Sequence, residues 1–167
     1  MFLVSNNEVQ KIWQILEAVC DPEVPVLSIL DLGIVRDVKI SGDKIEVVIT
    51  PTYSGCPAMD MIAMNIKLAL LEAGNKNITI TSVLSPAWTT AWMTESGKEK
   101  LKTYGIAPPH PTQTVCDTKL FAEAEAIQCP LCNSYHTKII SRFGSTPCKA
   151  LYQCLDCKEP FDYFKCH

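Results

Sequence analysis

Four cysteines near the end of the chain have the spacing of a metal site. "CPLC" and "CLDC" supply Cys129, Cys132, Cys154 and Cys157 in the pattern C-x2-C-x21-C-x2-C. Each pair can form a tight turn that directs two thiolates at one ion, and four thiolates satisfy tetrahedral Zn²⁺ without leaving a position for substrate. The pattern therefore predicts a structural zinc ribbon, and four free thiols is the alternative.

Other candidate ligands lie close to these cysteines in the sequence. Cys148, Cys166, His136 and His167 could each replace one member of the set. We interpret Cys148 as a small buried residue of the ribbon hairpin, because free cysteine packs like an apolar side chain. Cys166 and His167 end the chain, where fraying is common.

A single cysteine occupies a different kind of position. "TPTYSGCPAM", residues 50–59, places Cys56 where an apolar strand gives way to a helical pattern. Unpaired N–H groups and the helix dipole favour negative charge there, which predicts a stabilised thiolate. A thioredoxin-type motif would need cysteine at Met59, and a cysteine phosphatase would need arginine at Ile62. Two interpretations stay open: a buried cysteine that packs the junction, or one ligand to a metal shared with a partner.

The elements that must position Cys56 form an α-β-β-α-β-α order. Helical spacing of apolar residues predicts a helix over residues 6–19. "GIVRDVKI", "SGDK" and "IEVVIT" together predict a hairpin. A second helix follows from Pro57 to Gly74, then the strand "NITITSVL" and a short helix over residues 94–104. The order predicts a small α/β domain over residues 1–107.

The remainder of the chain has a different composition. Residues 108–128 are Pro-rich and then polar, which predicts a linker. Residues 129–167 are too few to build much of a core unaided, and domains of this size usually need a metal or disulfides. We therefore expect a C-terminal zinc ribbon over residues 129–167.

Composition excludes several classes of protein. The 167 residues are 47% hydrophobic and 20% charged, with a net charge of −3, as expected of a folded soluble protein. No apolar run approaches the ~20 residues that span a bilayer, and the start of the chain lacks the features of a secretory signal. With nine cysteines, an odd number, a closed disulfide framework is disfavoured. We expect a cytoplasmic protein with no membrane partner.

The charge of the ribbon disfavours nucleic acid as its partner. From Cys129 onward there are five Lys/Arg and three Asp/Glu, and four thiolates with one Zn²⁺ make the segment neutral. We interpret its aromatic residues (Tyr152, Phe161, Tyr163 and Phe164) as its core and not as a base-stacking platform. A protein contact surface is the better hypothesis for this module.

Two stretches carry a family resemblance. "DPEVPVLSILDLGIV", residues 21–35, and "TPTYSGCP" resemble the signature of the MIP18 (DUF59) family, over about residues 5–107. The resemblance implies an accessory factor in iron–sulfur protein assembly, not an enzyme. Cys56 matches the family's cysteine, and its signature matches at Asp21, Pro22, Glu23, Asp31, Leu32 and Gly33. From the residues alone, Asp21 and Asp31 are better explained by turn and capping chemistry than by direct ligation, and Gly33 by the turn into the hairpin.

The whole chain is similar to one subgroup, the D subunits of phenylacetyl-CoA epoxidases. "LSPAWTTAWMTESGKEKL", "YGIAPP", "CPLC" and "FGSTPCKALYQCLDCKEPFDYFKCH" carry that similarity. It implies a role in aerobic phenylacetate catabolism, where a multicomponent oxygenase with a di-iron centre and a flavin/iron–sulfur reductase performs ring 1,2-epoxidation. The chain has no Glu-x-x-His pair that would house a di-iron site itself.

These observations predict a non-catalytic accessory protein of the epoxidase that assists maturation of its iron or iron–sulfur centres. Cys56 would be a transient ligand to iron or a cluster, completed by a second chain or by the client. Expected partners are the oxygenase or reductase and general iron–sulfur assembly proteins, with a homodimer as a further option. The alternatives are a structural or regulatory subunit of the epoxidase and, with less support, a nucleic-acid-binding ribbon protein.

Overall fold

The computed structural model describes residues 6–109 and 127–165, and their contacts divide them into two compact units. The first unit runs to Trp88 and also includes residues 92–94, and the second holds residues 89–91 and everything from Glu95 onward. The predicted linker lies mostly outside the described residues, as do Cys166 and His167. Among the described helices, none combines the length and the hydropathy that a bilayer crossing requires.

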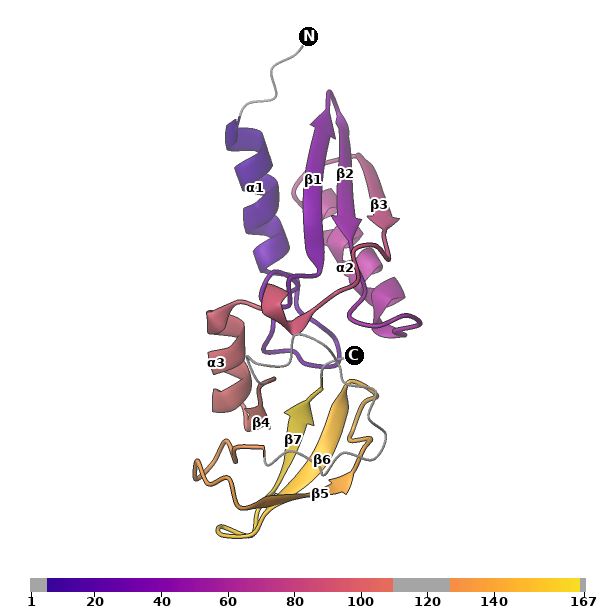
Figure 1. Cartoon of the computed structure of the whole chain (residues 1–167). Helices are drawn as coiled ribbons and strands as arrows, with labels where there is room; N and C mark the ends of the chain where they lie inside the picture. Colours follow the sequence, from indigo (N-terminus) through magenta and orange to yellow (C-terminus); the bar gives the residue numbers. More distant parts are fainter. Residues whose placement is uncertain (1–5, 110–126, 166–167) are drawn as a thin grey trace. The chain divides into compact units, whose positions relative to one another are not determined.

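The N-terminal unit is a three-stranded sheet with two helices packed on it (Figure 1). Helix α1 (Asn6–Glu17) precedes the hairpin of β1 (Val35–Ser41) and β2 (Lys44–Ile49), and α2 (Ala58–Glu72) then leads to β3 (Asn77–Ser82). β1 and β2 are antiparallel, whereas β3 pairs with β2 in parallel through the α2 crossover. α1 contacts β1, α2 contacts β3, and the two helices contact each other.

The sequence patterns account for these elements. Gly42 and Asp43 form the tight turn predicted at "SGDK", and Gly42 takes a φ of 62°, which a residue without a Cβ adopts readily. The apolar faces meet in one core, whose fully buried members include Leu16, Leu27, Ile29, Leu32, Ile34, Val47, Ile49, Ile62, Ile66 and Leu70. The predicted mixed α/β fold is therefore confirmed for this unit.

The C-terminal unit is built on a four-stranded sheet in the order β4-β7-β6-β5. β5 (Thr137–Ser141), β6 (Lys149–Cys154) and β7 (Pro160–Phe164) are antiparallel neighbours, and β4 (Ile106–Ala107) adds to β7 in parallel. Helix α3 (Glu95–Thr103) matches the last predicted helix, but the sequence patterns gave no indication of β4. α3 and β4 thus belong to the same compact unit as the ribbon, and the domain bounds at residues 107 and 129 stay a prediction.

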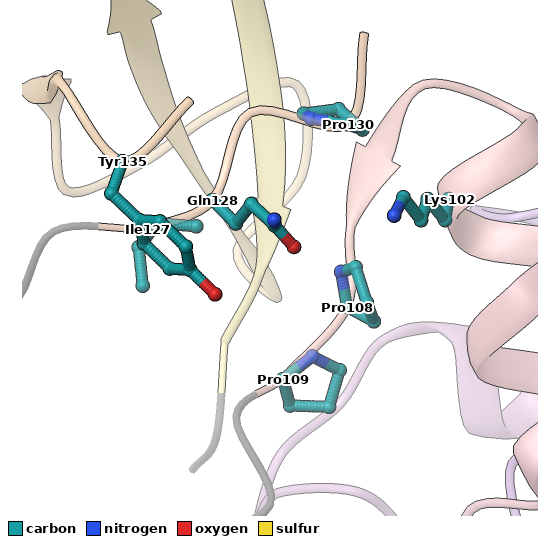
Figure 2. A pocket seen from close by; sticks show the side chains of 7 residues that line it. All are labelled: Lys102, Pro108, Pro109, Ile127, Gln128, Pro130 and Tyr135. Carbon is teal, nitrogen blue, oxygen red and sulfur yellow. The ribbon is translucent and has the colours of Figure 1, made fainter. Parts of the chain in front are cut away.

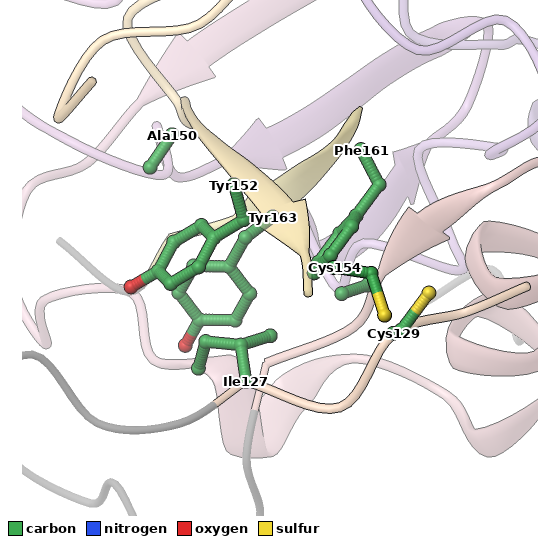
Figure 3. Packing of buried hydrophobic residues seen from close by; sticks show 8 residues of the cluster. Ile127, Cys129, Ala150, Tyr152, Cys154, Phe161 and Tyr163 are labelled. Atoms are coloured by element: carbon green, nitrogen blue, oxygen red, sulfur yellow. The ribbon is translucent and has the colours of Figure 1, made fainter. Parts of the chain in front are cut away.

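The core of this unit is small and mainly aromatic (Figure 3). Tyr152 stacks on Phe161 with ring centroids 5.9 Å apart and meets Tyr163 edge-on at 5.8 Å. Two cysteines, Cys129 and Cys154, belong to the same cluster and are fully buried. The aromatic side chains are therefore core residues, as predicted, and are not available to stack on bases.

Candidate metal centre and cysteine site

The structure brings the four predicted cysteines of the ribbon together. The sulfur atoms of Cys129, Cys132, Cys154 and Cys157 all lie within 4.8 Å of one another. The Sγ atoms of Cys129 and Cys157 are 3.8 Å apart, and those of Cys132 and Cys154 are 3.5 Å apart. Four sulfurs at about 2.3 Å from a tetrahedral Zn²⁺ would be about 3.8 Å from each other. The donor set and its spacing therefore fit a closed zinc site.

The two cysteine pairs lie in turns that share one backbone geometry. The residue directly after each pair, Asn133 or Lys158, has a positive φ, 61° and 70° respectively. Within the first turn, the amide of Asn133 donates to the Cys129 carbonyl at 2.9 Å, and the amide of Cys129 donates to the Ser134 carbonyl at 2.8 Å. A left-handed residue lets the chain reverse sharply, so both thiols of a pair face the same point.

Polar side chains next to the thiols connect the two turns. Asp156, in the second turn, accepts hydrogen bonds from the Ser134 hydroxyl and from Nδ1 of His136, the latter at 3.0 Å. Ser134 first, and then His136, hold the pKa of Asp156 below its usual value. The amide of Leu155 also donates to the His136 carbonyl at 2.7 Å. His136 is thus a partner of Asp156 in the structure and is not one of the gathered donors.

The remaining alternative ligands do not join the group among the described residues. Cys148 is buried, and its Sγ lies 3.0 Å from the Thr146 hydroxyl. The four-cysteine group is the only cluster of metal-binding side chains found in residues 6–109 and 127–165. Cys166 and His167 fall outside these ranges.

Cys56 lies in the turn between β2 and α2. Its amide donates to the Tyr53 carbonyl at 3.3 Å, and its own carbonyl accepts from the Met59 amide at 3.3 Å. Gly55 before it has a φ of 84°, and the space beside its Cα is open. The thiol is half-buried at the start of α2, as the sequence predicted for its position.

The environment of Cys56 corrects the expectation of a stabilised thiolate. Burial raises the pKa of the Cys56 thiol, and this outweighs the Ala58 amide and the Tyr53 side chain, which lower it. The carboxylates of Glu23 and Asp21 raise it further. The helix start does favour the anion, but desolvation and two negative charges oppose it. A metal ion that binds here must therefore displace a proton.

The signature aspartates perform turn and capping chemistry, in agreement with the interpretation from sequence. One carboxylate oxygen of Asp21 accepts from the amides of Glu23 at 2.6 Å and Val24 at 3.0 Å. Asp31 accepts from the Ser28 amide at 3.1 Å and from the Thr94 hydroxyl at 2.9 Å. Glu23 and Asp21 of this turn also lie close enough to Cys56 to raise the pKa of its thiol, an effect that the linear sequence does not reveal.

Gly33 has a second role that the sequence analysis missed. Its φ is 66°, as a turn residue requires, but a Cβ at this position would also lie 2.4 Å from the Trp92 carbonyl oxygen. Trp88 donates from Nε1 to the Leu32 carbonyl at 2.8 Å, and the Arg36 guanidinium lies 3.5 Å from the Trp92 ring centroid. The signature glycine therefore leaves room for the Trp92 backbone, which lies directly beside it.

The C-terminal unit also contains an open pocket of about 280 Å³ (Figure 2). It is lined by Lys102, Pro108, Pro109, Ile127, Gln128, Pro130 and Tyr135. Among the described residues, no cysteine, histidine or carboxylate lines this pocket.

Comparison with known proteins matches two parts of the chain to two families. Residues 9–81 match the model of a family described as iron-sulfur cluster assembly protein, and residues 113–165 match that of the PaaD zinc beta ribbon domain. An Escherichia coli (strain K12) protein, described as the putative D subunit of 1,2-phenylacetyl-CoA epoxidase, is 48% identical over 163 residues, which cover 98% of this chain and 96% of that protein. The chain belongs to the PaaD family, the D subunits of phenylacetyl-CoA epoxidase.

Two further relatives match part of the chain. A "Fe-S protein maturation auxiliary factor" from Porphyromonas gingivalis (strain ATCC BAA-308 / W83) is 31% identical over 102 residues, 58% of this chain and 96% of that protein. The crystal structure of a DUF59 domain from Bacillus anthracis is 30% identical, covers 56% of this chain and 90% of its own, and has a TM-score of 0.53. The PaaD-family chain thus combines a DUF59 fold with a zinc ribbon.

Proposed function

We propose that this chain is a non-catalytic accessory protein of phenylacetyl-CoA epoxidase that assists the maturation of iron or iron–sulfur centres in the oxygenase or reductase. The relatives supply the context: one is described as part of the epoxidase and another as a maturation factor for Fe-S proteins. General iron–sulfur assembly proteins are the expected donors. Both unit folds are consistent with a carrier that contains one structural zinc.

The observation that carries the proposal is the site around Cys56. A half-buried thiol lies at a turn, with the carboxylates of Glu23 and Asp21 close enough to change its pKa. Iron accepts a thiolate as a ligand, and a single thiol gives a weak site from which the metal can leave. Because the thiol holds its proton more firmly than usual, binding and release would be coupled to proton transfer.

The C-terminal unit supports this proposal as a docking and structural module. We propose that Cys129, Cys132, Cys154 and Cys157 hold its zinc, which leaves no open coordination position for catalysis. The neutral charge of residues 129–167 and their buried aromatic side chains argue against a nucleic-acid partner.

A test replaces Cys56 in cells that depend on the epoxidase. Cys56→Ser keeps the size of the side chain and removes the soft ligand, so the protein should fold and retain its zinc while epoxidase activity falls at least tenfold. The iron content of the purified oxygenase or reductase should fall in parallel. Cys20→Ser, at an exposed cysteine of the same unit, is the matched control. Normal maturation of the epoxidase in the Cys56→Ser strain would show that Cys56 only packs the strand–helix junction.

A structural or regulatory role inside the complex is the second candidate, because the Escherichia coli relative is described as a subunit. A permanent subunit should co-purify with the oxygenase in a fixed ratio and be needed for every turnover. A maturation factor should be dispensable once the metal centres are assembled. Activity assays of the purified, metal-loaded epoxidase components with and without this chain distinguish the two roles.

A further inference from the structure

Helix α2 has two apolar faces, and only one of them is used by the core. One face is buried, and it consists of Ala58, Ile62, Ile66 and Leu70. A second row, Met61, Met64, Leu68 and Leu71, is between 43% and 59% exposed, and we call it the Met/Leu seam. A helix that is apolar on both sides is expected to bury the second side against a partner.

The spacing of the seam specifies the kind of partner. Its residues follow one another at intervals of three, four and three, which are the a and d positions of a coiled-coil heptad. Such a seam packs against another helix by inserting side chains between those of its neighbour. An exposed methionine-rich surface also adapts readily to a partner, because the methionine side chain is flexible.

The charges beside the seam are complementary to a second copy of this chain. Lys67 and Glu72 are exposed and flank the seam on opposite sides, at the g and e positions of the heptad. Within the described residues, neither side chain has a hydrogen bond or an ion pair. In a parallel pair of α2 helices, Lys67 of each copy faces Glu72 of the other, five positions further along.

The opposite orientation brings like charges together. In an antiparallel pair in which Met61 packs against Leu71 and Met64 against Leu68, the two Lys67 side chains meet near the two-fold axis. Each surface ion pair of the parallel arrangement contributes only modestly, and like charges cost a similar amount. The charge pattern therefore favours the parallel orientation.

The size of the seam indicates a reversible association. Four half-exposed side chains on one helix form a small apolar patch. A stable interface buries about 800 Å² on each partner, so this seam alone supports a weak dimer.

We propose that two copies of this chain associate reversibly through parallel α2 helices packed along the Met/Leu seam. Because α2 begins directly after the Cys56 turn, the parallel pair presents two Cys56 thiols at one end. A second thiol would complete the iron site that one copy leaves weak, and this last step rests on the proposed function of Cys56. The pairing itself does not depend on it.

Sedimentation of the zinc-loaded, full-length chain over a concentration series tests the pairing. We expect a monomer–dimer equilibrium that Met64→Lys weakens at least tenfold, because it places a charge in the seam. Lys67→Glu should also weaken it, and Lys67→Glu combined with Glu72→Lys should restore it. Lys76→Glu, at an exposed lysine outside the helix, should change nothing. Circular dichroism verifies that each variant is folded.

Chemical crosslinking tests the parallel orientation of the two α2 helices. A short thiol-to-thiol crosslinker should join Cys56 to Cys56 of the second copy, and mass spectrometry of the digested product identifies the pair. A monomer at all concentrations, or a dimer indifferent to Met64→Lys, overturns the proposal. Failure of the combined charge swap to restore the dimer overturns its parallel orientation. None of these measurements involves iron or the epoxidase, so loss of the proposed function would leave them unchanged.

Discussion

Gly33 and Gly42 share a backbone conformation but differ in their surroundings. Their φ values are 66° and 62°, yet a Cβ at Gly33 would overlap Trp92, whereas the space beside Gly42 is open. Alanine substitutions at the two glycines can therefore separate two contributions to the free energy of unfolding. One is the strain of a left-handed backbone, and the other is a close contact of the added Cβ. The first cost is about 1–2 kcal/mol for a residue with a Cβ, and overpacking adds about 1–3 kcal/mol.

We predict that Gly33→Ala lowers the free energy of unfolding by about 1–3 kcal/mol more than Gly42→Ala does. The reason is that the Trp92 backbone must move before a methyl group fits at Gly33. Denaturant titration of both variants, monitored by circular dichroism, measures the difference. Equal losses of unfolding free energy in the two variants would mean that Gly33 is required only for the conformation of its turn.

Cys56 permits a prediction about reactivity against pH. Burial raises the pKa of this thiol above its usual value, so its thiolate fraction at pH 8 should be smaller than that of a cysteine in an unstructured peptide. Its alkylation by iodoacetamide should therefore be slower in the folded protein and should keep rising with pH beyond the point at which the peptide rate levels off. Mass spectrometry of the Cys56 peptide gives the rate. Reaction faster than the peptide would indicate a stabilised thiolate after all.

At the scale of elements, the ribbon depends on two turns that side chains hold together. Asp156 in the second turn accepts hydrogen bonds from Ser134 and His136, which follow the first turn, so it links the two turns that hold the sulfurs. Groups that orient metal ligands in this way commonly change metal affinity about 10–100-fold when removed.

Asp156→Asn keeps the shape of the side chain but replaces one acceptor oxygen with an NH₂ donor. The asparagine side chain therefore cannot accept the hydrogen bonds from both Ser134 and His136. Zinc transfer to a chromogenic chelator should become several-fold faster, with little change in the circular dichroism of the zinc-loaded protein. Glu159→Gln removes a charge from an exposed residue of the same turn region and is the control. An unchanged transfer rate in Asp156→Asn would show that the thiolates alone hold the turns.

At the scale of the molecule, the two units have separate cores with different dependence on metal. The N-terminal core is aliphatic, whereas the C-terminal core includes Cys129 and Cys154 themselves. Without zinc, no metal ion links the cysteines of that small core. A domain of this size has little other apolar surface to bury, so its folding depends on the metal.

Removal of zinc by a chelator should therefore unfold β5, β6 and β7 while α1, α2 and the first sheet persist. Hydrogen exchange measured by mass spectrometry should show protection lost in residues 127–165 and kept in residues 6–82. Restoring zinc should restore the protection. Loss of protection in both segments together would mean that the units unfold cooperatively.

The sequence by itself determined the features that depend on residue type and local spacing. Two C-x2-C pairs identified the sulfur cluster, because each turn is a local structure and zinc requires four such donors. Helical and alternating periodicity located α1, the hairpin, α2, β3 and α3, because each element buries one regular face. Its position between a strand and a helix, and then the family signature, singled out Cys56 as a candidate ligand, and that role stays a prediction.

Only the tertiary structure decided what surrounds those residues. β4 has two residues, too few for any periodicity, and it exists because β7 offers an edge. The pKa of Cys56 depends on burial and on Glu23, more than thirty positions away in the sequence. Only the structure shows that the Met/Leu seam is exposed, because the core buries the other face of α2. These properties arise from contacts between distant segments, whose geometry the local pattern of a sequence does not contain.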